Sequence, residues 1–134
     1  VVHIMPDQEG VSSKGGTMRL GDYPCHPQSQ TLTKAAYGTD SIMERHRHRF
    51  ELNNSYRESL ENSGLIVGGL SPDGNLVETG EVTGHPFMIG TQYHPEFKSR
   101  PNRPHPLFSR FIGAAKETIR EGVQRPLPLD INSD

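Results

Sequence analysis

The residues whose types and spacing most directly suggest chemistry are His94 and Glu96, which flank Pro95. In an extended segment, side chains two positions apart point the same way, so the carboxylate can reach the imidazole. A carboxylate on one ring nitrogen fixes the tautomer, and the other nitrogen can then take a proton from a nucleophile. The tripeptide predicts a general base with its orienting carboxylate. So short a match also arises by chance, and an exposed histidine beside a glutamate in a loop is the alternative.

A second candidate is the run RHRHRFEL at residues 45–52, whose period of two predicts a strand. An extended strand would place its arginines on one face and its histidines and phenylalanine on the other: Arg45, Arg47 and Arg49 against His46, His48 and Phe50. Guanidinium groups repel one another unless an anion lies between them, and their planar fork suits a carboxylate or a phosphate. The alternatives are an edge strand protected by charge and a non-catalytic module that binds phosphate or nucleic acid.

The sequence also contains candidate metal ligands and one thiol. Ligands from His46, His48 and His94 would be flanked by guanidinium groups that repel a dication, so we expect no metal site. Cys25 is the single cysteine, and the prolines around it do not suit a nucleophile elbow, so we predict a packing residue. One cysteine also forbids an intramolecular disulfide and fits a reducing compartment.

Composition limits the class of protein. The 134 residues make one domain, and only 31% of them are hydrophobic, so the core is small for the length. A net charge of −2 argues against a protein that coats polyanions. Every apolar stretch is shorter than the roughly 18–20 residues of a membrane span, and we expect a cytoplasmic protein without membrane contact.

Periodicity and turn residues predict alternating strands and helices. The expected strands are 1–4, 17–21, 45–52, 65–67, 76–78 and 87–89, and the expected helices are 31–37, 54–62 with a cap at Asn54 or Ser55, and 107–121. This alternation indicates the α/β class. The strand at 1–4 reads as buried, and chains seldom begin inside a buried strand, so we expect Val1 to continue a longer sequence.

The last expected helix carries a broad apolar stripe, formed by Leu107, Phe108, Phe111, Ile112, Ala115 and Ile119. Such a stripe needs a sheet to cover it, and few strands are expected. Part of the sheet is therefore expected to be missing from this sequence.

Four blocks, in this order, closely resemble the C-terminal half of the glutaminase domain of CTP synthases: GGTMRLG at 15–21, ERHRHRFELNN at 44–54, QYHPEF at 92–97, and SRP at 99–101 with HPLF at 105–108. The His-Pro-Glu element is common to class I glutamine amidotransferases, whereas the first two blocks are far more specific. Another class I amidotransferase or a γ-glutamyl hydrolase would not account for them. The resemblance implies a flavodoxin-like α/β fold with a mixed sheet flanked by helices, lacking the N-terminal strands and the nucleophile elbow. Residues 1–122 would belong to this domain, and 123–134 would form a disordered tail.

The resemblance also implies a reaction. In CTP synthases a synthetase domain uses ATP and Mg²⁺ to phosphorylate UTP, and ammonia displaces the phosphate to give CTP. The glutaminase domain makes the ammonia through a Cys-His-Glu triad and a glutamyl thioester, with GTP as allosteric activator. By matched position, His94 is the general base, Glu96 its orienter, Arg49 the ligand of the glutamine α-carboxylate, and Phe50 a wall of the glutamine pocket. The other basic residues of the strand would face a domain interface or GTP: Arg45, His46, Arg47 and His48.

The sequence departs from the family at one decisive point, because it contains no Gly-x-Cys-x-Gly elbow. We therefore expect no glutaminase activity from this chain alone and no cofactor bound by this segment. The expected partners are L-glutamine, the N-terminal half of the amidotransferase domain and the synthetase domain, in a homotetramer. The near-neutral charge and the lack of interleaved aromatic residues argue against nucleic acid.

Overall fold

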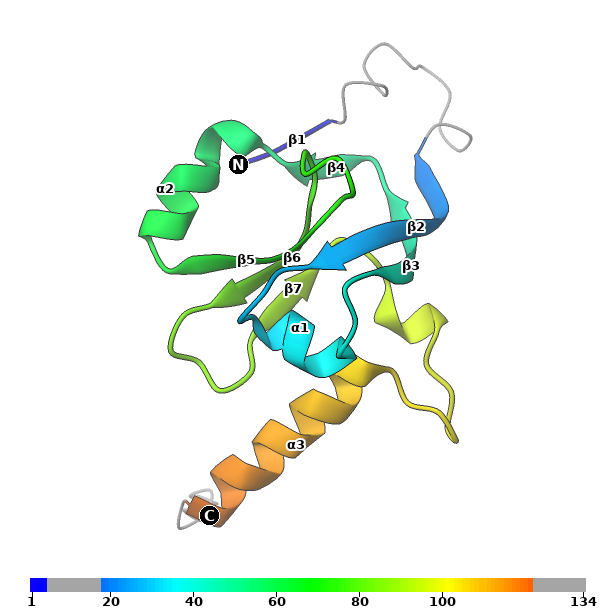
Figure 1. The fold of residues 1–134 in the computed structure, drawn as a ribbon, viewed down its shortest axis with the longest axis vertical. Helices are drawn as coiled ribbons and strands as arrows, with labels where there is room; N and C mark the ends of the chain where they lie inside the picture. Colours follow the sequence, from blue (N-terminus) through cyan, green and yellow to red (C-terminus); the bar gives the residue numbers. More distant parts are fainter. Residues whose placement is uncertain (5–17, 122–134) are drawn as a thin grey trace, which may run out of the picture.

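The computed structural model describes residues 1–4 and 18–121 (Figure 1). The elements are, in chain order, β1 (Val2–Ile4), β2 (Arg19–Pro27), α1 (Leu32–Tyr37), β3 (Ile42–His48), β4 (Phe50–Leu52), the 3-10 turn η2 (Asn54–Tyr56), α2 (Arg57–Asn62), β5 (Leu65–Leu70), β6 (Val77–Val82), β7 (Ile89–Thr91), the 3-10 turn η3 (Pro95–Phe97) and α3 (Pro106–Glu121). The predicted α/β class, with helices flanking a sheet, is confirmed. The tail expected from residue 123 lies outside the described residues.

The main sheet has five strands in the order β3-β2-β5-β6-β7, and β1 pairs with β4 in a separate two-stranded sheet. Every strand pair in the described part of the chain is antiparallel. Both β3 and β7 are edge strands of the main sheet, and the segment after β7 forms one isolated bridge to β3.

Strand β2 continues well past the predicted end at residue 21. It pairs with β3 from Arg19, opposite His48, to Cys25, opposite Ile42. Pro24 lies inside this strand, and its missing N–H is tolerated because β2 has a partner on only one side there. Pairing with β5 begins at His26. A long ladder to β3 thus overrides the turn signal of the prolines.

The predicted strand at 45–52 breaks at Arg49 into β3 and β4. Burial alternates as predicted along β3, where His46 is fully buried and Arg45 and Arg47 are exposed. Beyond the break the alternation is reversed, because Phe50 is 50% exposed and Glu51 is 5% exposed. The expectation that Phe50 shares a face with the two histidines is therefore wrong.

The short helices owe their ends to local hydrogen bonds. The side chain of Thr31 accepts the backbone N–H of Lys34 at the start of α1, and Gly38 ends this helix with φ 69°. The cap at the second helical segment lies one residue earlier than expected, since Asn53 accepts the N–H of Ser55 and the first turn is 3-10.

The core is small and partly polar, as the composition predicts. Its buried apolar side chains are Cys25, Ile42, Val67, Val77, Tyr93 and Leu107. Strand β1 exists, but its predicted burial is wrong, because Val2 is 66% exposed. Among the stripe residues of α3 whose burial the structure describes, only Leu107 is buried, whereas Phe108, Phe111 and Ile112 are between 40% and 54% exposed. This helix projects away from the sheet (Figure 1), and the stripe lacks a cover among the described residues.

Candidate active site

His94 lies just beyond β7, where the chain crosses the edge strand β3. Tyr93 forms an isolated bridge with His46, and the N–H of His94 donates to the carbonyl oxygen of Arg45 at 2.9 Å. His94 itself is extended, with φ −111° and ψ 92°, and Pro95 begins the 3-10 turn η3. The backbone thus fixes the histidine on β3 before the chain turns, and the turn rather than a strand pleat carries Glu96 round to it.

The predicted pair of His94 and Glu96 is present. Nδ1 of His94 lies 2.7 Å from Oε1 of Glu96, and its ring stacks on Phe97 with centroids 4.9 Å apart. The hydrogen bond with His94 lowers the pKa of Glu96, so the carboxylate is ionised and can only accept. Nδ1 therefore carries the proton, and Nε2 is the free basic nitrogen. The His94 side chain is 37% exposed, which leaves that nitrogen accessible.

Arg49 and Phe50 lie at the break between β3 and β4, whereas His94 is held further back along β3, at Arg45. The structure does not bring either of them into contact with His94 or Glu96. Arg49 is half-buried, and its guanidinium makes no hydrogen bond or ion pair with the described residues. Arg45 and Arg47 are exposed along the sheet edge, where charge protects a strand from unwanted pairing.

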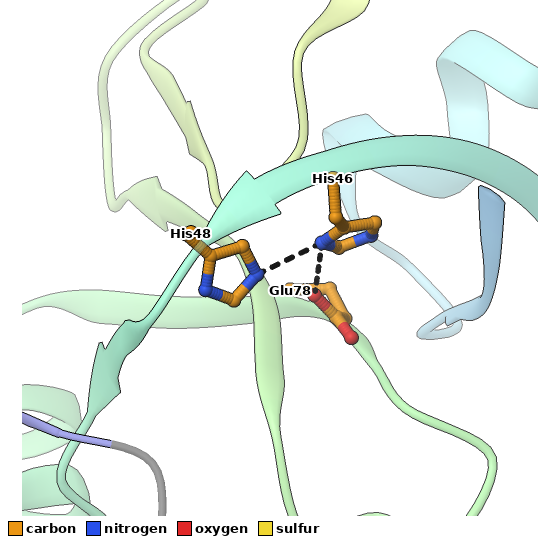
Figure 2. Close-up of side chains that lie close together, drawn as sticks. All are labelled: His46, His48 and Glu78. Atoms are coloured by element: carbon orange, nitrogen blue, oxygen red, sulfur yellow. Dashed lines mark hydrogen bonds and ion pairs between the residues drawn. The ribbon is translucent and has the colours of Figure 1, made fainter. Parts of the chain in front are cut away.

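His46 and His48 meet Glu78 of β6 in a buried cluster (Figure 2). His48 Nδ1 donates to the carbonyl oxygen of Phe50 at 2.9 Å, so its Nε2 accepts from Nδ1 of His46, also at 2.9 Å. Burial lowers the pKa of His46 to about 3, with Arg19 adding to the effect. These two hydrogen bonds, which we call the histidine relay, connect the buried core to the break at Arg49.

The same cluster is the set of residues whose geometry best suits a metal ion, because one ligand atom each from His46, His48 and Glu78 lies within 4.8 Å of the others. His94, the third histidine weighed as a ligand although the sequence predicts no metal site, is not part of this cluster. Arg19 donates to Glu78 from β2, and its positive charge opposes a dication at the same carboxylate. The arrangement therefore favours a hydrogen-bond network over a metal centre. Arg19 and Glu78 were missed from the sequence because they are 59 residues apart.

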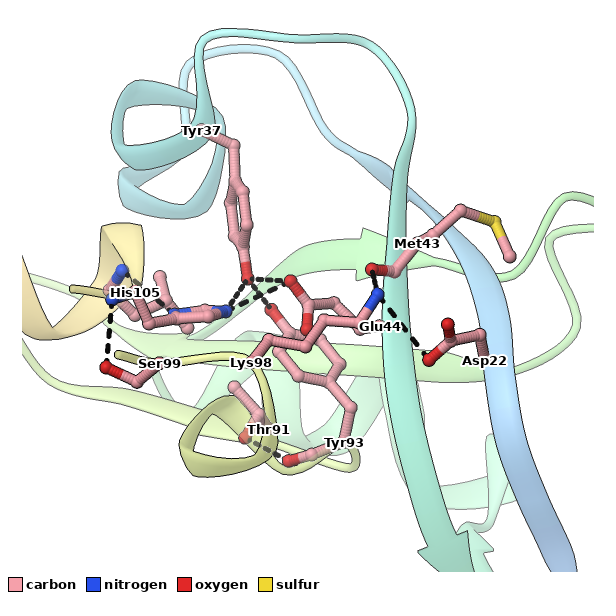
Figure 3. Close-up of polar contacts among 10 residues, drawn as sticks. Asp22, Tyr37, Met43, Glu44, Thr91, Tyr93, Lys98, Ser99 and His105 are labelled. Carbon is pink, nitrogen blue, oxygen red and sulfur yellow. Dashed lines mark hydrogen bonds and ion pairs between the residues drawn. The ribbon is translucent and has the colours of Figure 1, made fainter. Parts of the chain in front are cut away.

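A second buried cluster forms around the hydroxyl groups of Tyr37 and Tyr93 (Figure 3). Oε1 of Glu44 accepts the Tyr37 hydroxyl at 2.9 Å and lies 3.0 Å from Nε2 of His105. The Tyr37 hydroxyl also lies 3.2 Å from the Tyr93 hydroxyl. Burial raises the pKa of both tyrosines, so their hydroxyls stay protonated. No role was predicted for these residues, although Glu44 and His105 both lie in the motifs singled out above.

Cys25 is fully buried in β2. Burial, aided by the negative charges of Glu78 and Glu44, raises the pKa of its thiol to about 12. A neutral buried thiol is a packing group rather than a nucleophile, in agreement with the prediction.

Among the described helices none is both long enough and apolar enough to cross a membrane.

Comparison with known proteins gives the family. The model of the family "Glutamine amidotransferase class-I" matches residues 3–114. A CTP synthase of Dehalococcoides mccartyi is 64% identical over 129 residues, which are 96% of this chain and 24% of the relative. A CTP synthase of Roseiflexus castenholzii is 61% identical over 132 residues, 98% of this chain and 24% of the relative. The chain thus spans about a quarter of the curated relatives it matches, and the predicted resemblance to CTP synthases is confirmed.

Solved structures agree. The glutaminase domain of Trypanosoma brucei CTPS with bound acivicin superposes with a TM-score of 0.75 at 33% identity, covering 87% of this chain and 46% of that one. A Thermoplasma acidophilum protein described as part of a GMP synthase gives a TM-score of 0.59 at 16% identity, covering 91% of this chain and 52% of that one. The second likeness concerns the fold alone.

Proposed function

Because the chain belongs to the class-I glutamine amidotransferase family, we propose that it is a segment of a CTP synthase, a ligase of pyrimidine nucleotide synthesis in the cytoplasm. Within that enzyme it supplies the base and the orienting carboxylate for the hydrolysis of glutamine to ammonia. The observation that carries the proposal is the 2.7 Å contact from His94 Nδ1 to Glu96 Oε1, beside an accessible Nε2.

Each proton has a place in this arrangement. Nε2 of His94 takes the proton of a cysteine thiol from the rest of the domain, and the thiolate attacks the carboxamide carbon of glutamine. Glu96 stabilises the imidazolium through Nδ1–H. The imidazolium then protonates the amino group of the tetrahedral adduct, which leaves as ammonia as the thioester forms. Water hydrolyses the thioester, and His94 takes the proton of the attacking water.

Arg49 binds the α-carboxylate of glutamine in this proposal, because its guanidinium has no partner among the described protein groups and its fork matches a carboxylate. Phe50, which is 50% exposed, lines the glutamine pocket beside it. Arg45 and Arg47 are exposed and face a domain interface or GTP. His46 is fully buried, so in this proposal it contacts neither the domain interface nor GTP. His48 is half-buried, and its hydrogen bond to the carbonyl oxygen of Phe50 holds the backbone at the Arg49 break.

The other partners are the remaining parts of the same enzyme. The uncovered apolar groove between β7 and α3, lined among others by Phe87, Met88, Phe108 and Phe111, is where the N-terminal half of the amidotransferase domain packs. Residues 1–122 belong to that domain. ATP with Mg²⁺ binds the synthetase domain of the homotetramer, GTP activates it, and this segment binds no cofactor of its own.

The test is glutamine hydrolysis by the complete enzyme that contains this segment. His94→Asn should lower glutamine-dependent CTP formation by about 10²–10⁴-fold, whereas His85→Asn at an exposed histidine should leave it unchanged. Ammonia supplied in the buffer should restore CTP formation in the His94 variant. The 134-residue chain alone should release no ammonia, since it contains no Gly-x-Cys-x-Gly elbow and its one thiol, Cys25, is buried. Turnover by the chain alone, or a fully active His94 variant, contradicts the proposal.

A further inference from the structure

We propose that Glu44 is a positioning residue for proton transfer at His94, and that it acts through the hydroxyl of Tyr37, which lies against the hydroxyl of Tyr93. The inference rests on the proposed function, because it concerns the same base. It assigns a role to the second buried cluster, whose members Tyr37, Glu44, Tyr93 and His105 come from α1, β3, the segment after β7 and the loop before α3 (Figure 3).

One carboxylate oxygen of Glu44 accepts hydrogen bonds from both His105 and Tyr37. The backbone N–H of Leu107 donates to Nδ1 of His105 at 3.3 Å. Neutral His105 therefore carries its proton on Nε2, which donates to Glu44 Oε1 at 3.0 Å. The Tyr37 hydroxyl donates to the same oxygen at 2.9 Å. Glu44 is 3% exposed and His105 is 3% exposed, so these bonds form away from water.

The cluster reaches the base through Tyr93, which is 2% exposed. Its hydroxyl lies 3.2 Å from that of Tyr37, and its carbonyl oxygen accepts the Thr91 hydroxyl at 2.8 Å. The following N–H, that of His94, donates to Arg45. The residue directly before the base is thus held by its side chain on one cluster and by its backbone on β3.

The far end of the 3-10 turn is tied to β3 as well. Nζ of Lys98 donates to the carbonyl oxygen of Met43 at 2.6 Å and lies 3.5 Å from the Asp22 carboxylate (Figure 3). Residues on both sides of His94 and Glu96 are therefore anchored, while the pair itself stays exposed. An exposed base on a short turn needs such anchors, because a displacement of about 1 Å can cost on the order of 10²-fold in rate.

Stability alone gives a poor reason for this cluster. A buried carboxylate is costly, and well-packed apolar residues of similar volume often stabilise a fold at least as well. Hydrogen bonds, unlike apolar contacts, fix direction. The direction fixed here is that of the segment carrying His94.

The experiment uses the complete CTP synthase with Tyr93→Phe, which removes only one hydroxyl, and Glu44→Gln, which keeps the volume. The control is Glu61→Gln on α2, an exposed carboxylate that contacts only Arg57. Kinetics with glutamine and with ammonia are measured from pH 5 to 9. We expect both variants to lower kcat with glutamine by about tenfold, with KM for glutamine within twofold and ammonia-dependent synthesis unchanged. The acid limb of the glutamine profile should move to lower pH, because a misplaced imidazolium loses part of its carboxylate partner.

The pH profile separates positioning from simple loss of folded protein, which scales the profile without moving it. An unmoved profile in Tyr93→Phe, or a kcat equal to that of the control, overturns the inference. His94→Asn in the same assays keeps the two proposals apart. If that variant is inactive with glutamine and Tyr93→Phe is unaffected, the inference alone fails. If His94→Asn is fully active, the proposed function fails.

Discussion

Two histidine–carboxylate pairs in this molecule have similar lengths and opposite surroundings. His94 lies 2.7 Å from Glu96, with side chains that are 37% and 56% exposed. His105 lies 3.0 Å from Glu44, with side chains that are 2% and 4% exposed. The exposed histidine keeps Nε2 free, whereas both ring nitrogens of the buried one have partners. The comparison shows that exposure, rather than the pairing itself, decides whether a histidine can move protons or only hold structure.

The difference should appear first in stability. Glu44→Ala leaves His105 and Tyr37 without their buried acceptor, and breaking a buried pair costs about 3–5 kcal/mol. Glu96→Ala removes an exposed pair, which contributes about 0–1 kcal/mol. Urea unfolding of the two variants, followed by circular dichroism, measures both costs. Equal losses would mean that the two pairs do not differ as their burial indicates.

Activity should show the reverse order. In the complete enzyme, Glu96→Gln keeps the volume but leaves the imidazolium without a negative partner, and we expect kcat with glutamine to fall by about 10²-fold. The loss should exceed the roughly tenfold effect expected of Glu44→Gln. Asp40→Asn provides a matched control, since Asp40 is an exposed carboxylate paired only with Lys34. A Glu96 variant as active as this control would remove Glu96 from the mechanism.

These two pairs also mark how far sequence reasoning reaches. His94 and Glu96 are two positions apart, so local geometry alone can join them. Glu44 and His105 are 61 residues apart, and only the placement of β3 against the start of α3 brings them together. Composition and spacing carry no signal for such a contact.

The same limit explains the error at Phe50. The period of two predicts β3 correctly, but nothing in the sequence shows that the strand stops at Arg49. The break appears only when β4 pairs with β1, where Phe50 lies opposite Ile4. Distant pairing, rather than local propensity, decides which way the side chain points.

Arg49 offers a smaller test, set at the end of the buried histidine relay. Arg49→Lys keeps the charge but removes the planar guanidinium that can bind a carboxylate with two hydrogen bonds. KM for glutamine should therefore rise by about tenfold while kcat stays within twofold. Arg57→Lys on α2, whose side chain pairs with Glu61 on the same surface helix, is the control and should change neither. Steady-state kinetics of the complete enzyme decide it. An unchanged KM in Arg49→Lys would place the glutamine carboxylate elsewhere.

The smallest effect concerns acid stability and follows from the exposed pair. The hydrogen bond with His94 lowers the pKa of Glu96 in the folded state below its usual value. A depressed folded pKa stabilises the fold above the unfolded pKa of about 4.3, and the contribution is lost as pH falls through the folded pKa. Because the Glu96 side chain is 56% exposed, solvent limits the contribution to under about 1 kcal/mol.

Glu96→Gln should therefore lower the urea midpoint slightly at pH 7 and leave it equal to that of the parent chain near pH 2. Asp73→Asn is the comparison variant for this pH-dependent shift of the urea midpoint. The pKa of Asp73 is also lowered, but by hydrogen bonds from Ser71 and Asn75 rather than by a histidine. If Glu96→Gln shifts the midpoint equally at both pH values, its effect comes from packing. The exposed pair would then contribute through contact with Phe97 instead of through charge, and the contrast with the buried pair would rest on activity alone.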